Sequence, residues 1–307
     1  MTDLPAYRDL PGGRAWGLWG DNDQIGCLNL LTPERIAAAA RLVSKGAVFA
    51  LNLRIDRPDP PLYGRPAAKH TILGAGTNGR DDFLDSFNPQ SSSQWDSLRH
   101  IRHPRDGWYN GVSDEQIVSG EGGKLGIDVA ARRGIAGRGA LIDISRSKKF
   151  DYTKTEAITV GDLDAALRAQ KTTVQTGDIL LLHTGWLRWY AKESTPEQRN
   201  EMSDRNRLQT PGLAATEDMA EWLWDHHVAA VAADNPALEA WPPREETGGF
   251  LHHRLIPQLG MNIGELWWLA DLGDDCASDG VYEFFFTSAP LNVPGGVASP
   301  PNALAIK

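Results

Sequence analysis

The chain has 307 residues, of which 41% are hydrophobic and 23% are charged, and its formal net charge is −9. This acidic balance argues against nucleic acid or an anionic membrane as a partner, because both require a basic protein surface. Two cysteines are too few for a disulfide framework, no apolar run approaches the roughly 18 residues of a membrane span, and the N-terminus lacks the apolar segment of a signal peptide. We expect a cytoplasmic protein that forms a single domain over residues 1–307.

The first 90 residues combine irregular segments with one helix and one strand. Residues 1–31 are rich in Gly and Trp and are expected to form an irregular arm that would suit a contact between subunits. Thr32 followed by Pro33 is typical of a helix start, and Gly46 predicts its end. Residues 47–55 alternate apolar and polar side chains, which predicts a half-buried strand. Residues 56–90 lack periodicity and are expected to form a long functional loop or flap.

The rest of the chain alternates helices with apolar strands. A capping pattern at Thr159 and Asp162 begins a helix, and a second, amphipathic helix is predicted over residues 216–228. Further helical segments are expected within residues 114–134 and over residues 252–260, and strands over residues 139–145, 177–186, 228–234, 263–272 and 281–293. This order predicts an α/β fold with a mixed sheet and flanking helices.

The segment QSSSQWDSLRH, residues 90–100, is unusual because its polar side chains recur at even positions. In an extended backbone successive side chains alternate between two faces. Gln90, Ser92, Gln94, Asp96 and His100 would therefore share one face. Such a face is either a solvated edge or one wall of an active site.

A second group of polar residues lies near the C-terminus. His252 and His253 begin a predicted helix, and Glu265 lies on the following strand after a turn marked by Gly260. Carboxylates and imidazoles from separate segments are the ligands that a divalent metal site needs. The spacing alone does not distinguish such a site from unrelated polar residues.

Other polar residues have simpler explanations. His183 lies in an apolar run and is expected to be a hydrogen-bonded core residue. His226 and His227 end a predicted helix, where a cation interacts favourably with the helix dipole. Asp234 follows a buried strand, where either a ligand site or an Asn-Pro turn is expected.

Taken in chain order, these motifs resemble the cyclase family of metal-dependent hydrolases, which includes bacterial kynurenine formamidase and isatin hydrolase. The family's HxGTHxDxPxH motif has the length of QSSSQWDSLRH and shares its Asp and final His. GDILLLHTGW, VAAVAADNPALEAWP, the stretch from His252 to Glu265 and YEFFFTSAPLNVPGG follow in family order. The resemblance extends from about Trp16 to the end of the chain.

The resemblance implies roles for particular residues. The acid–base histidine of the family corresponds to His100. His252, with His253 as the alternative, corresponds to a metal-binding histidine. The full set of metal ligands that the resemblance implies is Gln90, Gln94, Asp96, His252 and Glu265.

Two glutamines stand where the family motif has histidines, which changes the expected metal chemistry. A similar sub-branch of the family reads Gln-x-Gly-Thr-Gln-Trp-Asp. Amide oxygen is a neutral, hard ligand that suits Mg, Mn or Ca better than Zn. We expect a divalent metal cofactor, Mn, Mg or Zn.

The resemblance implies a swivelling β/β/α fold and hydrolysis of a small amide, formamide or lactone by metal-activated water. A metal-dependent cyclase or lyase and a metal-free small-molecule-binding protein are the alternatives. Trp95, Trp108 and Tyr109 are candidate walls for an aromatic substrate, or core residues. The family's shared interfaces, together with eleven Trp, predict a homodimer or homotetramer.

Overall fold

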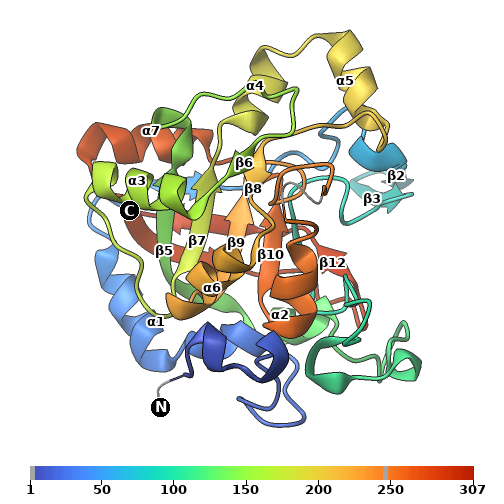
Figure 1. Cartoon of the computed structure of the whole chain (residues 1–307). Helices are drawn as coiled ribbons and strands as arrows, with labels where there is room; N and C mark the ends of the chain where they lie inside the picture. The colour runs from blue at the N-terminus through green and yellow to red at the C-terminus, as the bar shows by residue number, and fades with distance from the viewer. Residues whose placement is uncertain (1–3, 245–247) are drawn as a thin grey trace.

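A mixed β-sheet forms the centre of the protein in a computed structural model that describes residues 4–244 and 248–307 (Figure 1). Within these residues the sheet has nine strands in the order β1-β13-β11-β5-β7-β9-β10-β4-β12. Their bounds are β1 (Val48–Ala50), β4 (Gln94–Asp96), β5 (Ile135–Asp143), β7 (Ile179–His183), β9 (Ala230–Ala233), β10 (Asn262–Glu265), β11 (Glu283–Ser288), β12 (Ala298–Ser299) and β13 (Ala303–Ile306). β5, β7, β9 and β10 are parallel, and the pairs on both sides of them are antiparallel.

Helices flank this sheet, as a mixed α/β fold requires (Figure 1). α1 and α3 both contact β5, and α3 also contacts α6. The helices are α1 (Pro33–Ala39), α2 (Ile127–Arg133), α3 (Val160–Gln170), α4 (Trp186–Lys192), α5 (Pro196–Ser203), α6 (Glu217–Asp225) and α7 (Ala270–Asp279). Two small two-stranded sheets are formed by β2 (Lys69–Ala75) with β3 (Gly79–Asp85), and by β6 (Ala157–Ile158) with β8 (Gly212–Leu213). The predicted α/β fold with a mixed sheet and flanking helices is confirmed.

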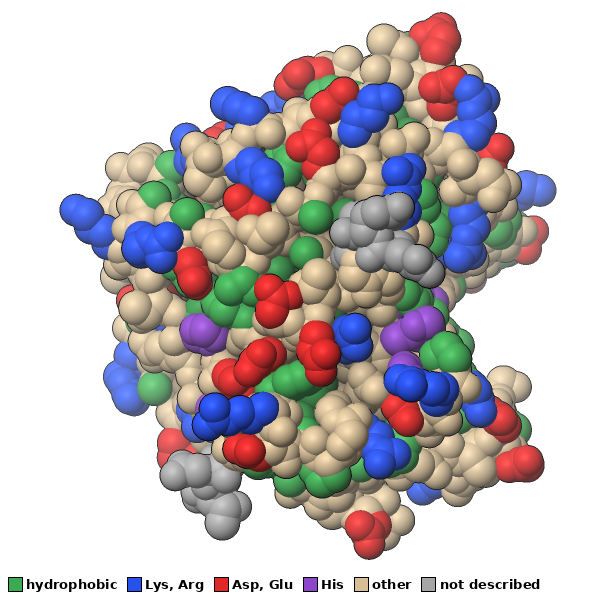
Figure 2. All heavy atoms as spheres, viewed as in Figure 1, with side chains coloured by type: hydrophobic (Ala, Val, Ile, Leu, Met, Phe, Trp, Pro, Cys, Tyr) green, Lys and Arg blue, Asp and Glu red, His purple; other side chains and the backbone are tan. Residues whose placement is uncertain are grey.

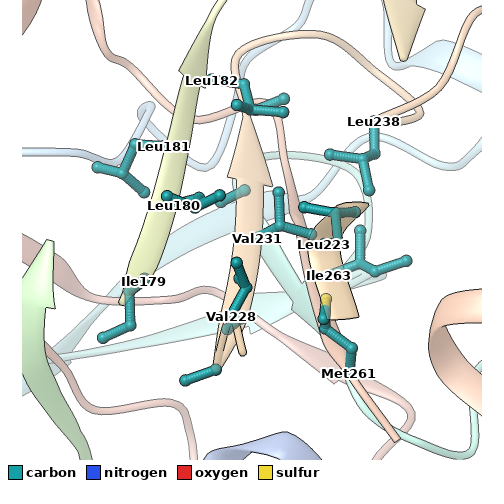
Figure 3. Close-up of a cluster of buried hydrophobic side chains, with 14 of the residues drawn as sticks. Ile179, Leu180, Leu181, Leu182, Leu223, Val228, Val231, Leu238, Met261 and Ile263 are labelled. Atoms are coloured by element: carbon teal, nitrogen blue, oxygen red, sulfur yellow. The ribbon is translucent and has the colours of Figure 1, made fainter. Parts of the chain in front are cut away.

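The main hydrophobic core lies around the parallel strands. Every residue of β7 is buried, and Figure 3 shows Leu180 between this strand and β9, with Val231 and Ile263 nearby. Strands buried on both faces read as continuous apolar runs, and the run ILLL on β7 has this property. Each such side chain contributes roughly 1.5–3 kcal/mol through its removal from water.

A second hydrophobic cluster holds the α4–α5 region against the main body. Trp186, Tyr190, Trp241, Leu62 and Leu266 belong to it. Because these residues come from distant parts of the chain, the cluster fixes the segments that surround the cleft described below.

The helix-start signals in the sequence are confirmed. The Thr32 side chain accepts a hydrogen bond from the Arg35 backbone at the start of α1. Thr159 and Asp162 form a reciprocal capping box at the start of α3. Such caps satisfy backbone N–H groups that have no partner within the helix.

Several predicted boundaries are wrong. The helix after Thr32 ends at Ala39 and continues only as a single tighter turn, and the strand expected over residues 47–55 covers three residues. Residues 56–90, expected to be a loop, contain the exposed hairpin β2–β3. The strand expected over residues 263–272 stops because Leu266 has a φ of 57°, which an extended strand excludes. Residues from Ala270 onward form α7.

The N-terminal arm packs against its own chain. Trp16 donates a hydrogen bond to the Pro257 carbonyl, and Trp19 contacts the Trp224 ring edge-on. Trp95, Trp186, Trp224 and Trp267 are fully buried within one copy of the chain. Burial of tryptophan therefore gives no physical reason for self-association, and the oligomer stays a prediction.

Cys27 and Cys276 are both free and buried, as the absence of a disulfide framework predicts. Across residues 4–244 and 248–307, no helix is long and apolar enough to cross a membrane. Basic and acidic side chains are interspersed over the face that Figure 2 shows.

A buried group of charges joins the carboxyl ends of three parallel strands. His183 on β7 places Nδ1 3.1 Å from an oxygen of Asp143 on β5, and Nε2 3.8 Å from an oxygen of Asp234. Asp234 also accepts hydrogen bonds from Thr184 and the Gly185 backbone. His183 and Asp234 thus join neighbouring strands, which agrees with the structural role expected for His183.

The pKa of His183 is set by two opposing effects. Burial lowers it, whereas the hydrogen bond to Asp143 and the negative charge of Asp234 raise it, and the net pKa is above the ordinary value despite the positive charge of Arg188. A group whose pKa is raised on folding stabilises the protein fully below its unfolded pKa, about 6.5 for His. This stabilisation is lost as the pH rises through the folded-state pKa.

We therefore expect His183→Gln to lower the free energy of unfolding more at pH 6 than at pH 9. Urea unfolding of the parent and the variant at both pH values measures this difference, with His70→Gln in the exposed hairpin as control. An equal loss for His183→Gln at both pH values would show that the imidazolium contributes nothing beyond packing.

Candidate functional site

A cleft of about 220 Å³ lies where several loops meet the ends of β4 and β10. Its charged and titratable lining consists of Arg65, His100, Arg205, His252 and Glu265. Tyr63, Trp241 and Phe250 provide aromatic walls, and Ile101, Pro236 and Ala237 complete the lining. The cleft is the candidate active site because it is the place where the two polar groups of the sequence meet.

The register between β4 and β10 brings the polar side chains together. In this antiparallel pair Gln94 lies opposite Glu265, and Asp96 lies opposite Ile263. Because side chains two residues apart share a face, Gln94, Asp96 and Glu265 lie on the same side of the sheet. All three are buried.

Hydrogen bonds link four of the polar side chains in a chain. Gln94 donates from Nε2 to Glu265 at 2.6 Å, and the other Glu265 oxygen lies 3.2 Å from His252 Nε2. His252 Nδ1 lies 2.8 and 2.9 Å from the two Glu239 oxygens. Glu239 is fully buried, so His252 lies between two carboxylates.

His100 reaches the cleft by a turn after β4 and not by strand alternation. Its backbone N–H donates to the Ser97 carbonyl, and its Nε2 lies 3.9 Å from an Asp96 oxygen. The Gln90 amide nitrogen lies 3.4 Å from His100 Nδ1. The single-face expectation therefore holds for Gln94 and Asp96, whereas Gln90 and His100 arrive through bends.

The donor atoms of this group fit a cation. Potential ligand atoms of Asp96, His100 and His252 all lie within 4.8 Å of one another. Both Asp96 carboxylate oxygens and Gln94 Oε1 are buried without a hydrogen-bond partner. An unpaired buried carboxylate is costly, and a divalent ion would satisfy these oxygens together. The residues present thus suit the metal that the sequence predicts.

The buried charges shift the pKa values of the cleft in opposite directions. Burial raises the pKa of Asp96, with the charge of Glu265 adding to this and those of His100, His252 and Arg65 opposing it. Burial also lowers the pKa of His100. Burial alone would lower the pKa of His252, but Glu239 and Glu265 raise it well above the ordinary value. His100 is therefore the neutral imidazole of the site.

The structure separates His252 from His253. His252 faces Glu239 and Glu265, whereas the His253 ring contacts Phe250 and His103 edge-on. Burial lowers the pKa of His253 to about 4. Of the two candidates, only His252 lies among the carboxylates.

The three aromatic residues expected to line a substrate site lie elsewhere. Trp95 points to the opposite face of β4. There the centre of its ring lies 4.7 Å from the centre of the Trp267 ring, and its N–H donates to Ser288. Tyr109 is fully buried and donates to Asp23, and the Trp108 N–H donates to Asp114. None of the three lines the cleft as the described residues define it. Of the two expectations, substrate wall or core, the structure supports the core: Trp95 and Tyr109 belong to it and Trp108 packs against it, whereas Tyr63, Trp241 and Phe250 form the aromatic walls.

Sequence reasoning also missed Glu239, Arg65 and Arg205. Glu239 is a lone carboxylate in the run PALEAWP directly after a buried strand, and this was a readable signal. Arg65 and Arg205 lie outside helices and strands, and no periodicity marks them.

Comparisons with known proteins identify the family of the chain. The Cyclase family model matches residues 29–240. A crystal structure described as a novel cyclase is 37% identical, with a TM-score of 0.83, and the match covers 96% of this chain and 99% of that chain. No match was found among curated proteins.

Two isatin hydrolases share the fold at lower identity. Isatin hydrolase A from Ralstonia solanacearum is 17% identical, with a TM-score of 0.59, and the match covers 90% of this chain and 98% of that chain. Isatin hydrolase A from Labrenzia aggregata, bound to benzyl benzoate, is 13% identical, with a TM-score of 0.57. The match covers 84% of this chain and 93% of that chain. At these identities the likeness concerns the fold alone. The family model spans more than half of the chain and the 37% identical structure spans nearly all of it, so the chain belongs to the Cyclase family.

Proposed function

We propose that the protein is a metal-dependent hydrolase of a small amide, formamide or lactone. One observation supports this most strongly. The buried, unpartnered oxygens of Asp96 and Gln94 lie directly behind His100, His252 and Glu265, which line a single cleft. A cation-binding group next to a general base is a combination that supports hydrolysis of an acyl bond by activated water.

The residues that would hold the ion are Asp96, Glu265, His252 and Gln94. Gln94 already donates through its amide nitrogen to Glu265, so its free oxygen is the atom available to a cation. Gln90 is less suited to a ligand role because its amide lies against His100. A divalent ion supplies Lewis-acid polarisation of a carbonyl and acidifies water. Oxygen-rich ligands favour Mn or Mg over Zn.

His100 is the proposed acid and base. Contact with Gln90 at Nδ1 fixes the ring, and Nε2 faces Asp96. Burial keeps the imidazole neutral by lowering its pKa. The amide nitrogen of Gln90 that faces Nδ1 is a donor, so the proposed role requires the Gln90 amide to turn its oxygen towards an Nδ1–H. Nε2 would then take a proton from the attacking water and return it to the leaving group. The cleft walls of Tyr63, Trp241 and Phe250 exclude water from one side of the substrate.

A metal-free binding protein is the second candidate, and a specific contact favours it. His252 with a raised pKa already places positive charge between Glu239 and Glu265. A ligating His must lose its proton, so this imidazolium and a metal ion compete for the same carboxylates. Metal titration decides between the two candidates.

We expect His100→Ala to reduce hydrolysis at least 100-fold while the protein stays folded, because a positioned acid–base group typically contributes 10²–10⁴ in rate. We expect a loss of at least the same size for Asp96→Asn, because it removes a carboxylate that would hold the ion. Turnover of a panel of aryl formamides and lactones, with circular dichroism to check folding, measures this. His70→Ala serves as control because His70 is exposed and outside the cleft. Activity of His100→Ala within about tenfold of the parent would remove His100 from its proposed role.

We expect Gln90→His combined with Gln94→His to raise the affinity for Zn, because two amides become imidazole donors. The parent should bind Mn or Mg in preference to Zn. Calorimetric titration of parent and double variant with Zn and Mn measures both affinities. If the parent binds neither ion and the double variant binds no better, the glutamines are not ligands and the metal-free candidate stands.

We expect Glu239→Gln to weaken metal binding by about 10–100-fold, because a carboxylate that holds the second nitrogen of a ligating His orients that ligand. The same calorimetric titration tests it, with Glu201→Gln at an exposed surface position as control. Unchanged affinity in Glu239→Gln would mean that His252 is not a ligand.

A further inference from the structure

Two arginines at the cleft are not explained by acyl hydrolysis itself. The Arg65 guanidinium lies 4.8 Å from the centre of the Tyr63 ring, and that of Arg205 lies 5.2 Å from the Trp241 ring. The Tyr63 and Trp241 rings contact each other edge-on, with 5.3 Å between the ring centres. Four side chains from three segments of the chain thus form one continuous wall with two positive charges.

Both guanidinium groups are available to an anion. Across residues 4–244 and 248–307, neither Arg65 nor Arg205 has a carboxylate within ion-pair distance, although Arg65 donates one hydrogen bond to the Gln90 carbonyl. The neighbouring Arg207, in contrast, pairs with Glu201. Arg205 is exposed and Arg65 is half-buried, so the two positive charges are accessible from the solvent side of the cleft.

The charge changes sign along the cleft. Glu265 lines the cleft and the buried carboxylates of Asp96 and Glu239 lie behind His252, whereas Arg65 and Arg205 lie on the cleft walls. Guanidinium groups bind carboxylates through paired hydrogen bonds, and aromatic side chains favour flat ligands. A volume of about 220 Å³ is small for a ligand site and suits a single ring.

We propose that the substrate is a small planar molecule with a carboxylate that Arg205 and Arg65 bind, and that this contact directs its amide or lactone carbonyl towards Asp96 and His100. This inference rests on the proposed hydrolytic function and adds the substrate's charge. Arg205 is the better test residue because Arg65 also holds the Gln90 backbone, and Gln90 contacts His100.

Matched probes test the inference. N-formyl derivatives of 2-, 3- and 4-aminobenzoate carry the carboxylate at three distances from the scissile bond, and formanilide lacks it. We expect the best isomer to exceed formanilide at least tenfold in kcat/KM. We expect Arg205→Ala to lower the kcat/KM of the best isomer by about tenfold, the lower end for a charge-assisted contact at an exposed site, and to lower the kcat/KM of formanilide by a smaller factor, because formanilide meets only the Trp241 wall that Arg205 covers. Arg205→Glu should reduce the kcat/KM of the best isomer further, because it replaces the positive charge with a negative one.

Arg207→Ala is the matched control, because Arg207 is an exposed arginine two residues away that does not line the cleft. We expect Arg207→Ala to leave kcat/KM unchanged both for formanilide and for the best formyl aminobenzoate. Equal kcat/KM for formanilide and all three isomers, together with no effect of Arg205→Ala, would overturn the inference and leave the proposed hydrolysis intact.

A binding measurement separates this inference from the proposed function. Calorimetric titration with the three aminobenzoates and with aniline requires no turnover. Tighter binding of one aminobenzoate than of aniline, lost in Arg205→Ala, would support carboxylate recognition even if no formyl probe is hydrolysed, in which case the hydrolytic proposal fails alone. Binding of aniline as tight as that of every aminobenzoate would overturn the carboxylate inference.

Discussion

The candidate site depends on the antiparallel pairing of β4 with β10. This register sets Gln94 opposite Glu265 and keeps Asp96 on the same face. A shift of one residue would turn all side chains of β4 to the other face, and Trp95 would then point into the cleft. The aromatic contact of Trp95 with Trp267 on the core side opposes such a shift. The packing of Trp95 on the core face of β4 thus keeps Gln94 and Asp96 on the face that carries the candidate site.

The same pairing gathers negative charge in a place without water. Asp96, Glu265 and Glu239 are all buried, and like charges at short range in a poorly polarisable interior are unfavourable. The His252 imidazole between two of these carboxylates offsets part of that cost, while both oxygens of Asp96 lack a partner. A cation is the simplest group that would complete the site, and the arginines above it extend the positive charge towards the solvent.

Local sequence patterns predicted the elements whose cause is local. The Thr159 capping box and the apolar run of β7 are both visible in the sequence, and the resemblance to the family motif gives Asp96 and His100 as candidate site residues. The sequence carries the same kind of capping pattern at Thr195, before α5. Tertiary contacts decide what the patterns could not. The end of β10 at Leu266 follows from a backbone conformation that a hydrophobic run does not signal. The cleft walls likewise come from loops that only the fold brings together.

We propose above that the buried oxygens of Asp96 and Gln94 belong to a cation site. Anomalous diffraction from crystals soaked in manganese chloride is the direct test of this site. We expect a strong anomalous peak bounded by Asp96, Glu265 and His252, with Gln94 Oε1 turned towards it. A manganese peak elsewhere, or none near Asp96 at millimolar manganese, would contradict it.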